Sequence, residues 1–122
     1  MNNLMQRLAW LLLTSIMMIG DGATQTAKIV GTGATRCATF LNDVAGTPVY
    51  EREYFSWAQG YMSGILFRAP PDKDQYLDLT PPEFPVKTQL EFFRNYCATH
   101  PQEGYADAVE TLYKRLRDFS PK

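Results

Sequence analysis

The amino-acid sequence predicts an all-α fold, a compact four-helix bundle with one inter-helix disulfide and a long proline-rich loop between its second and third helices. Three observations support this prediction. Apolar residues recur at helical spacing in four segments, prolines and glycines separate these segments, and the chain contains two cysteines, Cys37 and Cys97.

The amino-terminal 27 residues have the layout of a secretory signal peptide. Arg7 supplies a positive charge, and the apolar run 8–19 follows it, which is too short for the roughly 20 residues of a membrane-spanning helix. We expect cleavage between residues 20 and 27, export to the periplasm, and a mature single domain of residues 28–122 without a membrane span. The alternative is an uncleaved amino-terminal anchor or a buried core helix.

The charge balance excludes one class of function. The chain carries 12 Lys and Arg against 13 Asp and Glu, a formal net charge of −1 at pH 7. Its basic residues are scattered among the acidic ones and form no cluster or basic face. We therefore expect no binding to nucleic acid.

Two helices are predicted after an irregular lead-in at residues 28–35, which contain two glycines and no apolar periodicity. From Thr35 on, apolar residues at i, i+3, i+4 and i+7 predict a short helix that Gly46 and Pro48 end. The second helix is predicted over about residues 50–66. The core-facing residues of the two helices are Cys37, Phe40, Leu41, Val44, Tyr54, Ala58, Tyr61, Met62 and Ile65.

The third and fourth helices are predicted from their own apolar stripes. The third covers about residues 86–99, and His100 and Pro101 end it. Pro101 suits the first position of the fourth helix, because proline is tolerated where no helical N–H bond is needed. The two stripes are Val86, Leu90, Phe93 and Cys97, and then Tyr105, Val109, Leu112 and Leu116.

A strip of small residues, Ser56, Gly60 and Gly64, repeats every four positions in the second helix. Each glycine costs about 1 kcal/mol against alanine in a helix. We therefore expect the strip to face a closely packed helix of the same chain. The same spacing would suggest helix dimerisation in lipid, but Arg52 and Gln59 argue against a membrane.

The two cysteines are predicted to form the disulfide. Export places Cys37 and Cys97 in an oxidising compartment, where pairing is the default for a small domain, and both lie on the apolar face of their helix. The bond would close a loop of about sixty residues and contribute roughly 4 kcal/mol. The alternative is a pair of free thiols acting as nucleophile or metal ligand.

The segment 68–85 is predicted to be a long loop, since it holds five of the eight prolines. Loops longer than about 12 to 15 residues are uncommon in compact domains and are often functional. Aromatic residues are also more numerous than a small core requires, and interfaces are enriched in them. The candidate partner-binding residues are Tyr50, Trp57, Tyr76 and Phe84.

The sequence indicates no enzyme, metal or cofactor site. One histidine and two paired cysteines are too few for a zinc site, and Asp72, Asp74 and Asp78 lack the glycine and terminal glutamate of an EF-hand. Cys97 and His100 could form an activated thiolate only if Cys97 were reduced. A hydrolytic activity lost on replacing His100 would support that enzymatic alternative.

Three short motifs carry a family resemblance: Cys37–Leu41 (CATFL), Trp57–Gly64 (WAQGYMSG) and Asn95–Pro101 (NYCATHP), followed by Ala106, Ala108 and Leu112. Together they resemble the Tai-type immunity proteins and related small exported proteobacterial proteins. A looser similarity is to the HdeA acid-stress chaperones. Ile65 and Leu66, where the family would have a polar residue, and the proline-rich loop depart from the first group.

The resemblance implies a helical periplasmic protein that binds and blocks a secreted antibacterial effector, typically one that attacks cell-wall peptide. We therefore expect a non-enzymatic protein-binding module. The alternative is an acid-stress chaperone: with its acids protonated near pH 2, the chain would become strongly cationic and expose its apolar helices.

Overall fold

The computed structural model describes residues 28–121, and the predicted signal peptide lies outside them. These residues form four α-helices, α2 (Cys37–Gly46), α3 (Pro48–Arg68), α4 (Val86–Thr99) and α5 (Tyr105–Leu116), with short 3-10 helices η1 (Thr32–Ala34) and η2 (Arg117–Phe119). The all-α four-helix prediction is confirmed. Within residues 28–121, no helix combines the length and the apolar character that a bilayer crossing requires.

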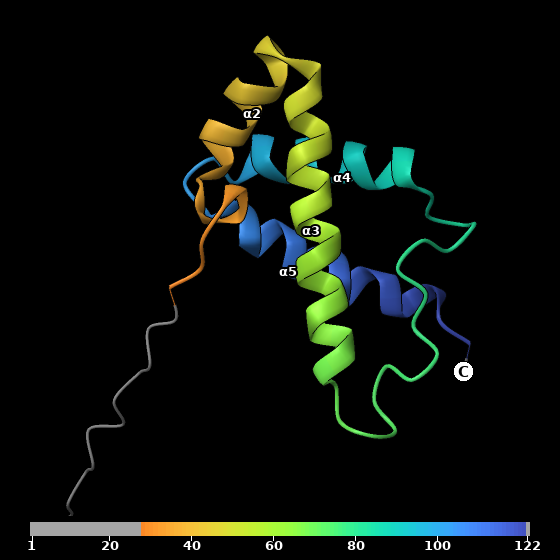
Figure 1. The fold of residues 1–122 in the computed structure, drawn as a ribbon. Coiled ribbons are helices and arrows are strands. Elements are labelled where there is room, and N and C mark those ends of the chain that lie inside the picture. Colours follow the sequence, from red (N-terminus) through yellow and green to blue (C-terminus); the bar gives the residue numbers. More distant parts are fainter. Residues whose placement is uncertain (1–27, 122) are drawn as a thin grey trace, which may run out of the picture.

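The longest helix, α3, stands at the front of the molecule in Figure 1, with α2 beside its first half and with α4 and α5 crossing behind it. Each helix contributes at least one ring to an aromatic core. The Tyr105 ring of α5 lies with its centroid 4.8 Å from that of Phe40, 5.0 Å from Tyr54 and 5.2 Å from Phe93. Tyr105 is fully buried, so this ring is the point at which the four helices meet.

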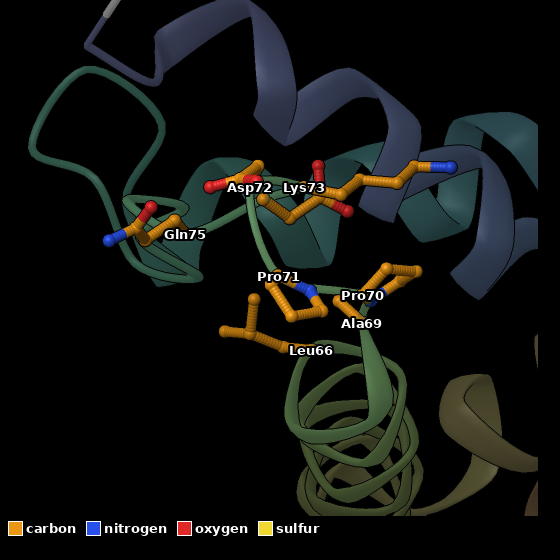
Figure 2. Close-up of a pocket in the computed structure, with 8 residues that line it drawn as sticks. Leu66, Ala69, Pro70, Pro71, Asp72, Lys73 and Gln75 are labelled. Atoms are coloured by element: carbon orange, nitrogen blue, oxygen red, sulfur yellow. The ribbon is translucent and has the colours of Figure 1, made fainter.

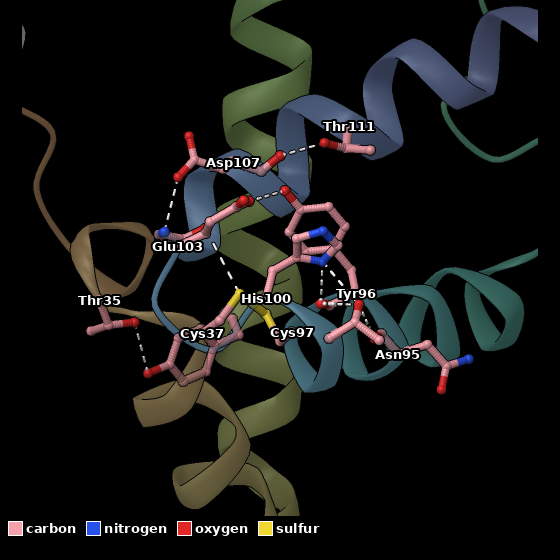
Figure 3. The surroundings of a disulfide bond; sticks show 12 residues. Thr35, Cys37, Asn95, Tyr96, Cys97, His100, Glu103, Asp107 and Thr111 are labelled. Atoms are coloured by element: carbon pink, nitrogen blue, oxygen red, sulfur yellow. Dashed lines mark hydrogen bonds between the residues drawn. A yellow bond between two sulfur atoms is a disulfide. The ribbon is translucent and has the colours of Figure 1, made fainter.

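The Cys37–Cys97 disulfide is confirmed and joins the start of α2 to the end of α4 (Figure 3). Beside it, the Cys37 N–H donates to the carbonyl of Glu103 at 2.8 Å, and the Ala38 N–H donates to that of Pro101 at 3.0 Å. The first N–H groups of a helix have no partner inside the helix. The turn between α4 and α5 therefore caps α2, which has no side-chain cap of its own.

That cap explains why the prediction for Pro101 is wrong. Residues 101–103 form a turn, and α5 begins at Tyr105. The carbonyls of Pro101 and Glu103 accept bonds from α2, so these residues cannot also form a first helical turn directed along α5. The Asp107 carboxylate instead accepts the Gly104 N–H at 2.9 Å at the true helix start.

The predicted packing role of Ser56, Gly60 and Gly64 is also wrong. All three are exposed, and a Cβ added at either glycine would meet nothing within 4 Å. The buried face of α3 is the opposite one, which carries Tyr54, Phe55, Ala58 and Met62. These larger side chains bury more apolar area against the neighbouring helices, so they determine which face of α3 turns inward.

The irregular lead-in packs against α3. The Trp57 indole N–H donates to the Val30 carbonyl at 3.0 Å. A Cβ at Gly33 would lie 2.0 Å from the Trp57 ring, and Gly31 has a φ of 82°. The two glycines are therefore required by a close approach and by a left-handed backbone.

Candidate partner-binding surface

The four aromatic candidates fall into two classes. Tyr50 at the start of α3 is 44% exposed, and Tyr76 in the loop is 69% exposed. Trp57 is instead stacked on Tyr61, with 5.0 Å between ring centroids, and Phe84 is stacked on Phe119 at 5.3 Å. The structure therefore engages Trp57 and Phe84 within the chain, which leaves Tyr50 and Tyr76 as the candidates that offer a ring to a partner.

An acidic residue ties the first half of the loop to the end of α5. Arg117 donates from Nε to Oδ1 of Asp74 and from Nη2 to Oδ2, both at 2.8 Å, and the Tyr113 hydroxyl donates to Oδ2 at 2.9 Å. Paired bonds between a guanidinium and a carboxylate are strong and specific in direction. We call this arrangement, Asp74 with Arg117 and Tyr113, the Asp74 clamp.

The clamp changes the acidity of its members. The Arg117 hydrogen bonds lower the pKa of Asp74 below its ordinary value, against an opposing effect of burial. Burial, together with the nearby carboxylate, raises the pKa of Tyr113 to about 12. At neutral pH the clamp therefore holds a carboxylate, a guanidinium and a neutral phenol.

A buried amide ties the second half of the loop to α4. Gln89 is fully buried, and its Nε2 donates to the carbonyls of Leu79 at 2.9 Å and Phe84 at 3.0 Å. Sequence reasoning missed Gln89 and placed Val86 on the core stripe, although Val86 is 39% exposed. The signal was present, because Gln89 lies four residues before Phe93 on the same helix face.

Two surface depressions lie along the loop that the Asp74 clamp holds. Two adjoining depressions of about 400 and 260 Å³ share Asp72, Asp74 and Gln75, and Figure 2 shows the first of them at the end of α3. The second is bordered by Tyr76 and by the end of the described chain. We call the loop surface the lining of these depressions, which is Leu66, Ala69–Leu77, Arg117, Ser120 and Pro121.

A third depression of about 290 Å³ lies between α3 and α5, lined by Tyr61, Ile65, Glu110, Tyr113, Lys114 and Arg117. The Tyr61 hydroxyl donates to Glu110 at 2.8 Å. Burial and the Glu110 carboxylate raise the pKa of Tyr61 to about 12. Arg117 borders both this depression and the loop surface, so the two lie side by side.

The groups considered for chemistry do not converge. The sulfur of Cys97 is bonded to Cys37, and the His100 ring stacks on Tyr96 with 4.3 Å between centroids (Figure 3). Asp74 faces Arg117, whereas Asp78 accepts the Thr80 N–H at 2.8 Å. Among residues 28–121, no three His, Cys, Asp or Glu residues are grouped as metal ligands.

No protein-family model matches the chain, and no curated protein or solved structure does either.

Proposed function

We propose that the mature chain is a non-enzymatic periplasmic module that binds a protein partner through the loop surface. The observation that carries this proposal is the exposed ring of Tyr76, 69% accessible, on a loop fixed between the Asp74 clamp and Gln89. Aromatic rings are enriched in protein interfaces. A loop that is already ordered loses little conformational entropy on binding, so more of the contact energy appears as affinity.

The resemblance to the Tai-type immunity proteins supports a specific class of partner, a secreted antibacterial effector that the chain would block. The loop surface suits such a role because it combines apolar prolines with charged groups of both signs. Pro70 and Pro71 adjoin Asp72 and Lys73 in one depression. A polar rim around apolar contacts is typical of specific interfaces.

The test is affinity capture from a periplasmic extract with the oxidised mature chain, comparing wild type with Tyr76→Ala and Tyr50→Ala. Tyr50 is a matched control, since it is an exposed tyrosine at the start of α3, and the loop surface lies at the other end of this helix, whose length is about 30 Å. We expect one stoichiometric partner that Tyr76→Ala loses and Tyr50→Ala retains. Equal retention by all three proteins would disprove the role of the loop surface.

The acid-stress chaperone is the second candidate, and the Asp74 clamp favours it. Acid protonates Asp74 and removes a tie from a loop whose Leu77 is buried against the core. Capture repeated after acid exposure separates the two proposals. Many bound proteins that appear only after acid exposure would favour the chaperone, whereas one partner at neutral pH would favour the immunity-like role.

A further inference from the structure

The outward face of α3 carries no charge over three turns. Its exposed positions from Ser56 to Phe67 are Ser56, Gly60, Ser63, Gly64 and Phe67. Phe67 is 86% exposed, the highest value among the large apolar side chains of the described chain. Charged residues are depleted from interface centres and occur at their rims, as Glu53 and Arg68 do at the two ends of this face.

A surface hollow lies at the opposite end of the same face. It is lined by Val49, Arg52, Glu53 and Ser56, so its centre lies between Arg52 and Glu53. Gly60 is midway: Phe67 follows it by seven residues, and the hollow's centre precedes it by seven to eight. At 1.5 Å per residue, both lie about 11 Å from Gly60 along the helix axis.

We infer that two copies of this chain associate through antiparallel α3 helices, with the two-fold axis at Gly60 and with each Phe67 inserted into the other copy's hollow. A two-fold axis at Gly60 places Phe67 of one copy opposite Glu53 of the second, and Ser56 opposite Gly64. A parallel pair would place Phe67 against Phe67 and hollow against hollow. The face is therefore complementary to itself in the antiparallel order.

The backbone allows the helices to approach closely at the axis. A Cβ at Gly60 or Gly64 would meet no atom of its own chain within 4 Å, so nothing within the monomer requires glycine at these positions. Glycine in a helix costs about 1 kcal/mol against alanine. A second helix lying over Gly60 would account for both residues.

Charge at the rim is consistent with the same register. With 100° per residue, Glu53 and Arg68 lie on one side of the line through Gly60, and Arg52 lies on the other. In the antiparallel pair, Arg68 of one copy therefore lies beside Glu53 of the second and away from its Arg52. Such rim pairs contribute little energy but favour one orientation over another.

The experiment is sedimentation equilibrium of the oxidised mature chain over about a thousandfold range of concentration. We expect a monomer–dimer equilibrium, whose dissociation constant rises about tenfold or more in Phe67→Ala. Gly60→Leu should abolish the dimer without unfolding the monomer, because the site is open and leucine favours a helix. Tyr76→Ala, in the loop surface, should leave the dimer unchanged, so this inference can fail independently of the proposed function.

Charge reversal tests the register. Glu53→Arg or Arg68→Glu alone should weaken the dimer, and the two together should restore it, since the pair is remade in the opposite sense. A wild-type chain that stays monomeric throughout, or a dimer that Gly60→Leu leaves intact, would overturn the inference.

Discussion

The two ends of the molecule are held together by different kinds of interaction. Around the Cys37–Cys97 disulfide, backbone hydrogen bonds also join the start of α5 to the segment before α2, since the Tyr105 N–H donates to the Thr35 carbonyl at 2.8 Å. At the loop end, side chains make the ties, through Asp74 and Gln89. A covalent bond and backbone pairs persist over a wide pH range, whereas a carboxylate tie depends on its charge.

This difference indicates that the loop can open while the helices stay packed. Local opening costs less free energy than global unfolding wherever few contacts hold a segment. The apolar anchors of the loop are the buried Leu77 and Pro81 and the partly buried Leu79 and Phe84, and its polar ties are those of Asp74 and Gln89.

The largest effect is expected from removal of the disulfide. Replacing both Cys37 and Cys97 by alanine should lower the free energy of unfolding by about 4 kcal/mol, because the bond closes a loop with a sequence separation of 60. Urea unfolding followed by circular dichroism measures the change. A reducing agent should destabilise the wild type to a similar extent and leave the double variant unaffected; an unchanged wild type would contradict the prediction.

A smaller effect is expected from Gln89→Leu. The substitution keeps the volume but removes the donor for the Leu79 and Phe84 carbonyls, at a cost of about 2 kcal/mol. Compared with the wild type, the variant should show faster amide hydrogen exchange in residues 69–85 and unchanged exchange in α2. Glu91→Gln, an exposed change on the same helix, is the control, and it should change the free energy of unfolding by no more than about 0.5 kcal/mol. If Gln89→Leu costs no more than this control, the Gln89 hydrogen bonds do not hold the loop.

The smallest effect, and the only one that depends on pH in the acid range, is expected from Asp74→Asn. Because Arg117 lowers the pKa of Asp74 in the folded state, its stabilisation is present above the unfolded-state pKa of about 3.9 and is lost as the pH falls through the lowered value. We expect a loss of about 1 kcal/mol at pH 7 that disappears in strong acid.

Asp72→Asn is the matched control for that measurement. Asp72 is exposed in the same loop and also has a positive φ, 72° against 57° for Asp74, and asparagine tolerates this conformation. Unfolding curves recorded from pH 7 down to about pH 2 should separate Asp74→Asn from wild type only in the upper part of this range. Equal curves for all three proteins at pH 7 would show that the clamp does not stabilise the fold.

The sequence by itself determined the number of helices, most of their boundaries and the disulfide. The third helix was predicted over 86–99 and is found at Val86–Thr99, because a stripe at helical spacing and flanking prolines are local signals. The two cysteines could be paired because the chain has two of them and both lie on the apolar face of their helix. The helices depend on residues that are close in sequence, and the disulfide depends on a pairing for which two cysteines allow one choice.

The apolar stripe also predicted the buried face of α3, since Tyr54, Ala58 and Met62 are buried. Only the tertiary structure decided that the strip of small residues in α3 faces outward, where α5 begins and what holds the loop. The start of α5 depends on carbonyls that accept bonds from α2, more than sixty residues earlier in the chain. The Asp74 clamp joins residues 43 positions apart, and the amide of Gln89 is buried because it binds the backbone of the loop. Hydrogen bonds between distant segments leave no periodic pattern in the sequence, since each is satisfied only once the fold brings donor and acceptor together.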